Sequence, residues 1–184
     1  MLLAALLSAT NAAITTDSGT YSNTTDISAS QAVSTKVKEI VSLLDGTQAG
    51  IDSAKAKYLD GYGVDAGNLK TLAGDVCSTC TGVTTCASMK AVYDVSCFLT
   101  NYIDSIIDDT SLTAEARSQW FRVAIQDGIP VQLAISYMEE ATASATASDW
   151  DKAAAVLLGT DADRGYAVYG RADGLARDYG TLDG

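Results

Sequence analysis

The C-terminal stretch 149–181 concentrates tyrosine, aspartate and arginine side chains in a short length of chain. Within it, Tyr166, Tyr169 and Asp173 are spaced three and four residues apart, a spacing that places side chains on one face of a helix. Phenolate and carboxylate oxygens are hard donors, which suit a hard, highly charged cation. The pattern therefore indicates a metal site. The alternative is a core helix edged by tyrosines, with an acidic flank in solvent.

Three further carboxylates are weaker candidates for the same site. Glu139 and Glu140 follow Tyr137 in an expected helix, and Asp151 lies near the start of the next one. Adjacent glutamates in a helix usually form a solvated face, which is the alternative here. Arg171 is a candidate to bind an anion beside the cation, or else it only balances the nearby aspartates.

The residues present argue against several familiar kinds of site. The run Asp161–Gly165 resembles the start of an EF-hand loop, but glycine falls at its fifth position and Ala172 occupies its twelfth. The chain has no histidine, which removes the commonest general base and the commonest zinc ligand. No carboxylate pair stands out for sugar hydrolysis. The sequence therefore predicts a protein that is not an enzyme.

Length and charge limit the remaining possibilities. A chain of 184 residues is long enough for one domain with a real core, which we place at 31–184. Its formal net charge of −11 would repel a nucleic acid and suits cations or high solubility. We therefore expect no nucleic-acid partner.

The N-terminal residues indicate secretion. Residues 1–13 form a short apolar run that ends in small residues, as in a signal peptide, and they are too few to span a bilayer. Residues 14–30 are polar and without periodicity, so we expect an exposed leader, and Asn23 begins a glycosylation acceptor sequence. No transmembrane segment is expected. The alternative is that the apolar run begins a mature cytosolic protein.

The four cysteines support the same interpretation. Their pattern is C-x2-C-x5-C-x10-C, which lacks the second close pair of a four-thiolate metal site. Two disulfides are the favoured interpretation for a secreted chain, and three connectivities remain open. They would tie a loop to the helix that follows. The residues are Cys77, Cys80, Cys86 and Cys97.

Apolar residues recur at helical spacing along most of the chain, which predicts an all-α protein: a helical bundle with short turns and a disulfide-tied loop. We expect Trp120, Phe121, Ala124 and Ile125 to face inwards and the chain to break at Asp127–Pro130. Ser148 is an expected N-cap and Gly159 an expected C-cap of one helix, and Tyr166 to Asp173 should share the next. The expected helices cover about 31–44, 48–60, 88–107, 113–126, 130–147, 148–158 and the run after 165.

Several phrases in this sequence resemble a known family. Trp150-Asp151, Ala153-Ala154 and the ending Tyr169-x-x-Ala172-Asp173 with Tyr179-Gly180-Thr181 are similar to a signature of the algal Fe-assimilating proteins. These are low-iron-inducible periplasmic proteins related to the phytotransferrins. The segment 54–61, AKAKYLDG, resembles a second motif of that family. The chain departs from the family at Gly174-Leu175, where relatives carry a basic residue followed by cysteine.

The resemblance implies extracellular or periplasmic capture of ferric iron, coupled to carbonate, for uptake by a photosynthetic microalga. A cell-surface protein or a larger extracellular assembly would then be a partner. The proposed ligands come from chemistry: Fe³⁺ favours oxygen donors and lowers the pKa of a tyrosine from about 10, so that phenolate can bind. The alternative function is a secreted helical module without metal that has a structural or interaction role.

Overall fold

The computed structural model describes residues 14–16, 19–59, 91, 98–160, 163 and 166–180, and these are mostly helical. The predicted all-α class is therefore confirmed. The four cysteines lie outside the described residues, so the disulfide-tied loop stays a prediction. The helices are α1 (Ser28–Leu43), α2 (Gln48–Leu59), α5 (Phe98–Asp108), α6 (Ala114–Val123), the π-helix η1 (Ala124–Gly128), α7 (Ile129–Ser144), α8 (Ala147–Leu158) and α9 (Val168–Asp178).

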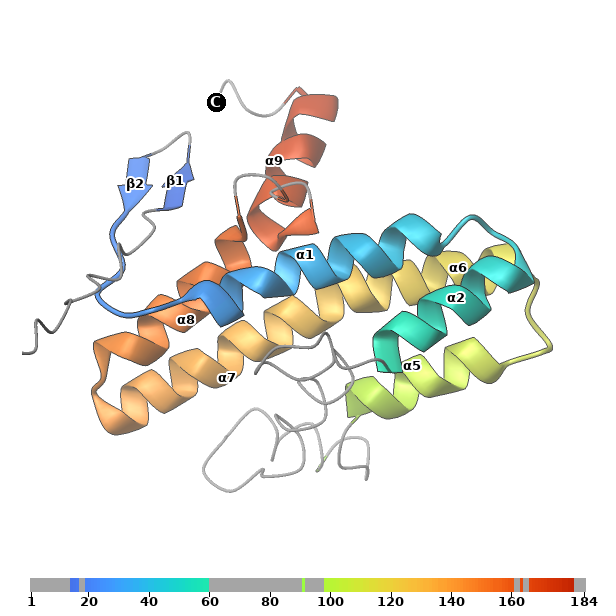
Figure 1. Ribbon diagram of the computed structural model, residues 1–184, viewed down its shortest axis with the longest axis horizontal. Helices are drawn as coiled ribbons and strands as arrows, with labels where there is room; N and C mark the ends of the chain where they lie inside the picture. The colour runs from blue at the N-terminus through green and yellow to red at the C-terminus, as the bar shows by residue number, and fades with distance from the viewer. Residues whose placement is uncertain are drawn as a thin grey trace, which may run out of the picture.

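The helices form a bundle along one long axis (Figure 1). α1 packs against α8, and α8 returns beside α7 after a turn of two residues. α2 and α5 pack at the opposite end of the bundle, near α6. α9 stands apart at the top of the view and crosses the direction of α1. None of the described helices is long and apolar enough to cross a membrane.

The core forms where the apolar faces of these helices meet. Tyr58 of α2 packs edge-on against Phe121 of α6, with ring centroids 5.8 Å apart. Such an arrangement favours contact between the positive edge of one ring and the negative face of the other. Of the residues expected to face inwards on α6 and η1, Phe121, Ala124 and Ile125 are buried. Trp120 is 55% exposed and lies against Tyr102, so its predicted burial is wrong.

Arg117 joins three helices inside this end of the bundle. It is buried, and its guanidinium donates to the carbonyl oxygen of Ile107 at 3.0 Å and to the side chain of Gln48. A buried charge is tolerated only when hydrogen bonds replace its hydration. Arg117 thus fixes α6 against the end of α5 and the start of α2.

The predicted break at Asp127–Pro130 is wrong, because α6, η1 and α7 continue one another from residue 114 to 144. Pro130 has no backbone N–H to donate and lies in the first turn of α7. The helix widens there: the Ile129 amide donates to the carbonyl of Ala124, five residues back. The widened π turn thus keeps the helix continuous through the proline.

Two further predictions are wrong: the N-cap of α8 and the exposed leader at residues 14–30. α8 begins at Ala147 with Thr146 as its N-cap residue, so Ser148 is not the cap. Residues 14–30 are not simply an exposed leader. β1 (Ile14–Thr16) pairs antiparallel with β2 (Gly19–Tyr21), and Asn23, Ile27 and Ser30 are buried against the bundle. Contacts with α8 hold this segment in place.

Candidate functional site

α9 starts later than the tyrosine spacing predicts. Its first residue is Val168, and Ala167 before it has an extended backbone, with φ −91° and ψ 155°. Tyr166 therefore does not share a helix with Tyr169 and Asp173, and the predicted single face of three ligands is wrong. The cause is a tertiary contact. Ala167 is buried against Gly159, where an added Cβ would lie only 2.7 Å from the Ala167 Cβ.

Gly159 makes this close approach possible. It closes α8 as predicted, with φ +69° and ψ −159°, and its amide donates to the carbonyl of Ala155 at 2.8 Å. That backbone conformation is essentially restricted to glycine. The chain can therefore turn sharply after α8 and bring Asp163 onto α1.

Arg171 of α9 pairs with a carboxylate that sequence reasoning missed. Its Nη1 lies 3.0 Å from Oδ1 of Asp127, in the π turn. Burial raises the pKa of Asp127 above its ordinary value, and the charge of Arg171 only partly opposes this. A π turn inside a long helix often marks a functional site. The one sequence signal for it is the pair Gly128 and Pro130, which on pattern alone predict a helix break.

A second ion pair lies where the chain crosses α1. Lys38 Nζ is 2.6 Å from Oδ1 of Asp163, and the Thr35 hydroxyl donates to Oδ2 of the same carboxylate, also at 2.6 Å. These hydrogen bonds lower the pKa of Asp163, and the Asp163 partner raises that of Lys38. Lys38 also interacts electrostatically with Tyr166, whose ring packs partly against the main core.

Two separate polar contacts thus lie near the start of α9: Arg171 with Asp127, and Lys38 with Asp163 and Tyr166. We call these five residues the α9 junction. Two of its members, Tyr166 and Arg171, were predicted site residues. Asp127, Asp163 and Lys38 were not: the contact of Asp127 with Arg171 depends on the π turn, and the contact of Asp163 with Lys38 depends on the sharp turn after Gly159.

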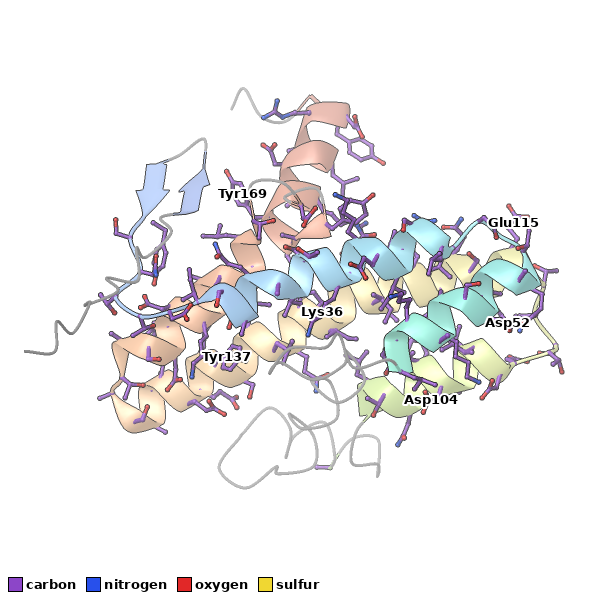
Figure 2. The ribbon with its side chains drawn as sticks, in the orientation of Figure 1. Lys36, Asp52, Asp104, Glu115, Tyr137 and Tyr169 are labelled. Atoms are coloured by element: carbon purple, nitrogen blue, oxygen red, sulfur yellow. The ribbon has the colours of Figure 1, made fainter. Side chains whose placement is uncertain are left out.

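The other two predicted ligands of this region lie on α9 itself. Tyr169 projects from α9 on the side of the β1–β2 hairpin, and the side chain is partly buried (Figure 2). Asp173 accepts from Arg177 on the next turn, with Oδ2 3.1 Å from Nε. Asp173 is therefore held in an ion pair within its own helix.

Glu139 and Glu140 belong to another part of the molecule, the α7–α8 hairpin. Their helix neighbour Tyr137 is drawn below α1, away from Tyr169 (Figure 2). Lys152 of α8 lies over the Tyr137 ring, 5.6 Å from its centroid, and the charge of Glu140 contributes to raising the pKa of Lys152. Glu140 thus lies near a local cation–π contact.

Asp151 is turned towards the N-terminal segment. Its Oδ1 accepts from the Tyr21 hydroxyl, and its Oδ2 accepts from both the amide and the hydroxyl of Thr24 and of Thr25, at 2.7 to 3.1 Å. Burial alone would raise the pKa of Asp151, but these hydrogen bonds outweigh it and lower that pKa to about 2. The carboxylate thus anchors residues 21–25 to α8.

The same anchor encloses the predicted glycosylation residue. Asn23 is only 7% exposed, and its Nδ2, the atom that would carry a glycan, donates to the carbonyl of Thr25 at 2.6 Å. The Thr25 hydroxyl of the acceptor sequence is hydrogen-bonded to Asp151. Glycosylation of Asn23 stays a prediction, and in this fold it would require residues 21–25 to leave α8.

Within the described residues, no group of three or more His, Cys, Asp or Glu side chains is arranged to hold a metal ion. No protein-family model, curated protein or solved structure matches this chain. The α9 junction is therefore described by its own chemistry: one phenol, two carboxylates and two cationic side chains in two contacts near the start of α9.

Proposed function

We propose that this protein captures ferric iron, together with carbonate, at the α9 junction. Capture would take place outside the cell or in a periplasm and would supply iron for uptake. The observation that carries the proposal is the ion pair of Arg171 with Asp127 in the π turn. Tyr166 lies two residues before the start of α9. The resemblance to algal Fe-assimilating proteins supports the same function. No catalytic step is involved, and iron is the cargo.

Asp127 is the carboxylate best suited to accept a cation. Its raised pKa means that burial opposes its charge more than Arg171 compensates for it. A bound cation would supply the missing compensation. Asp163, in contrast, is already satisfied by Lys38 and Thr35. We therefore assign Asp127 and Tyr166 as the main ligands, with Tyr169 and Asp173 of α9 as further oxygen donors.

Arg171 supports the coupling to carbonate. If Asp127 turns to the metal, the guanidinium loses its partner 3.0 Å away and is left beside the cation. A planar guanidinium binds an oxyanion through two parallel N–H bonds. Carbonate would then bridge Arg171 and the iron, which gives a reason for binding iron and carbonate together.

The experiment is a titration of the metal-stripped protein with Fe³⁺, with and without bicarbonate, followed by visible absorption. We expect a tyrosinate-to-iron charge-transfer band that requires bicarbonate and is lost in Tyr166→Phe. Asp127→Asn should weaken binding about 10-fold or more, as expected for the loss of a charged ligand. Tyr137→Phe, in the α7–α8 hairpin, is the matched control and should keep the band. Absence of any band and of saturable binding would refute iron capture.

A second candidate function, an interaction module without metal, is supported by a separate observation. α9 carries apolar side chains that face solvent, among them Leu175 and Tyr179. A secreted helical module with a structural role would use such a surface to bind a partner.

A further inference from the structure

Asn23 begins the acceptor sequence Asn23-Thr24-Thr25, yet its side chain is covered by the fold. It is only 7% exposed, whereas Ser22 and Thr24 on either side of it are exposed. A glycan is bulky and hydrated, so an asparagine that carries one belongs on the surface. The acceptor sequence and the packing of Asn23 therefore require opposite positions for the same side chain.

The segment cannot turn Asn23 into solvent and keep its other contacts. Nδ2 of Asn23 donates to the carbonyl of Thr25 at 2.6 Å, and Thr24 and Thr25 donate to Asp151 through both amides and both hydroxyls. A rotation that exposes Asn23 would move these donors away from the carboxylate. The Thr25 hydroxyl, which completes the acceptor sequence, is itself one of them. The attached segment is thus not a substrate for glycosylation.

The order of synthesis opens a period in which the acceptor sequence is accessible. Asparagine is glycosylated on the growing chain as it enters the secretory compartment, and Asp151 follows Thr24 by 127 residues. At about 5–20 residues per second, roughly ten seconds separate the two. Asn23 is therefore exposed to the modifying enzyme before the carboxylate that would hold its segment exists.

Release of the segment would be local. Ile27 is 3% exposed and stays fixed at the start of α1, where its carbonyl accepts from the Gln31 amide at 2.9 Å. Asp26 accepts from the Ser28 amide at 2.9 Å, which ties it to the same helix end. Only the residues before Asp26 would leave, and the core of the bundle would keep its packing.

Release would also leave no buried charge without a partner. Asp151 is 4% exposed while it holds the donors of Tyr21, Thr24 and Thr25. Once the segment is gone, water reaches the carboxylate and replaces those donors, so that the cost of an unpaired buried charge does not arise. A chain with a released segment can therefore still fold.

We propose that N-glycosylation of Asn23 and attachment of residues 21–25 to α8 exclude each other. A chain that receives the glycan folds with the segment released, and an unmodified chain folds with the segment attached. One modification thus determines whether Asp151 is covered or open to solvent. The proposal applies to a chain that enters a glycosylating secretory compartment, and it does not depend on iron.

Hydrogen exchange of the Thr24 and Thr25 amides reports on attachment, because these amides donate to Asp151 at 2.7 and 3.1 Å. The full chain secreted by eukaryotic cells, with its glycan identified by mass spectrometry, is compared with the unmodified chain from bacteria. We expect both amides to exchange about 10-fold faster or more in the glycosylated chain. Asp151→Ala should cause the same acceleration in the unmodified chain and no further one in the glycosylated chain.

The matched control moves the acceptor sequence by one residue. Asn23→Ala removes the natural site, and Ser22→Asn in the same background creates a new acceptor sequence that ends at Thr24. Because Ser22 is exposed, a glycan at position 22 fits the attached segment. The Thr24 and Thr25 amides should then exchange as slowly as in Asn23→Ala alone.

Three results would overturn the proposal. The first is a secreted wild type that carries no glycan on Asn23. The second is a glycosylated chain whose Thr24 and Thr25 amides exchange as slowly as those of the bacterial protein. The third is an equal acceleration by the glycan at position 22, which would mean that the burial of Asn23 does not decide the outcome.

Discussion

Tyr21 and Asp151, 130 residues apart in the sequence, are joined by a hydrogen bond from the phenol to the carboxylate. The same carboxylate holds the amides and hydroxyls of Thr24 and Thr25. Asp151 is 4% exposed, so water cannot replace these donors. One side chain of α8 therefore attaches the whole segment between β2 and α1 to the bundle.

Replacing Asp151 should release that segment. Asp151→Ala removes a charged acceptor of five hydrogen bonds, and we expect it to lower the free energy of unfolding by about 3 kcal/mol. Urea denaturation followed by circular dichroism measures this, and limited proteolysis at residues 21–27 should become faster. Asp108→Ala, which removes the exposed ion pair with Lys55, is the control and should cost less than about 1 kcal/mol. Equal losses in the two variants would show that Asp151 is no anchor.

The anchor should also make stability depend on pH in two windows. The folded-state pKa of Asp151 is lowered to about 2, so its contribution is present above the unfolded pKa of about 4 and is lost as the pH falls through 2. Burial and the contact with Asp151 raise the pKa of Tyr21 to about 12, so its contribution is present below about pH 10 and is lost as the pH rises through 12.

The measurement is the melting temperature of wild type and Asp151→Ala between pH 2 and pH 11. Other carboxylates titrate in both proteins, so only the difference between the two reports on Asp151. We expect this difference to be largest near neutral pH and to shrink towards both extremes. A difference that does not change with pH would mean that the ionised carboxylate is not what holds the segment.

Local periodicity predicted the helical core because each core helix buries one regular stripe. Val33, Val37 and Ile40 recur at spacings of four and three, and all three are buried on α1. Thr113 stands directly before α6, where a hydroxyl side chain is a favoured N-cap, and it accepts from the Ala116 amide at 3.2 Å. These features depend only on neighbours along the chain, which a sequence displays directly.

The α9 junction could not be predicted in the same way, since its geometry depends on distant contacts. Pro130 predicts a break in the helix, but the chain forms a π turn there instead. Leu99 packs close to Gly128 in this turn: a Cβ added at Gly128 would lie only 3.0 Å from the Leu99 side chain. Tyr166 does not share a helical face with Tyr169, because Ala167 packs on Gly159 and has an extended backbone. The anchoring role of Asp151 could not be predicted either, because its donors lie more than 120 residues away in the sequence.

Gly159 is therefore the residue on which the position of Tyr166 depends most directly. Gly159→Ala would place a Cβ 2.7 Å from the Ala167 Cβ and 3.0 Å from Ser34, in a backbone conformation that alanine rarely adopts. We expect a loss of about 3 kcal/mol in the free energy of unfolding, since strain and steric overlap add. Denaturant unfolding measures this loss. A loss below about 1 kcal/mol would mean that the turn after α8 can shift without cost.

Gly174→Ala is the matched control for this variant. Gly174 lies within α9, and its added Cβ would meet no described atom within 4 Å. Alanine is favoured over glycine inside a helix, so this change should stabilise α9 by up to about 1 kcal/mol. The same two variants test whether the geometry of the α9 junction governs iron capture. Under conditions where both variants are folded, Gly159→Ala should weaken the tyrosinate-to-iron charge-transfer band. Gly174→Ala should leave this band unchanged.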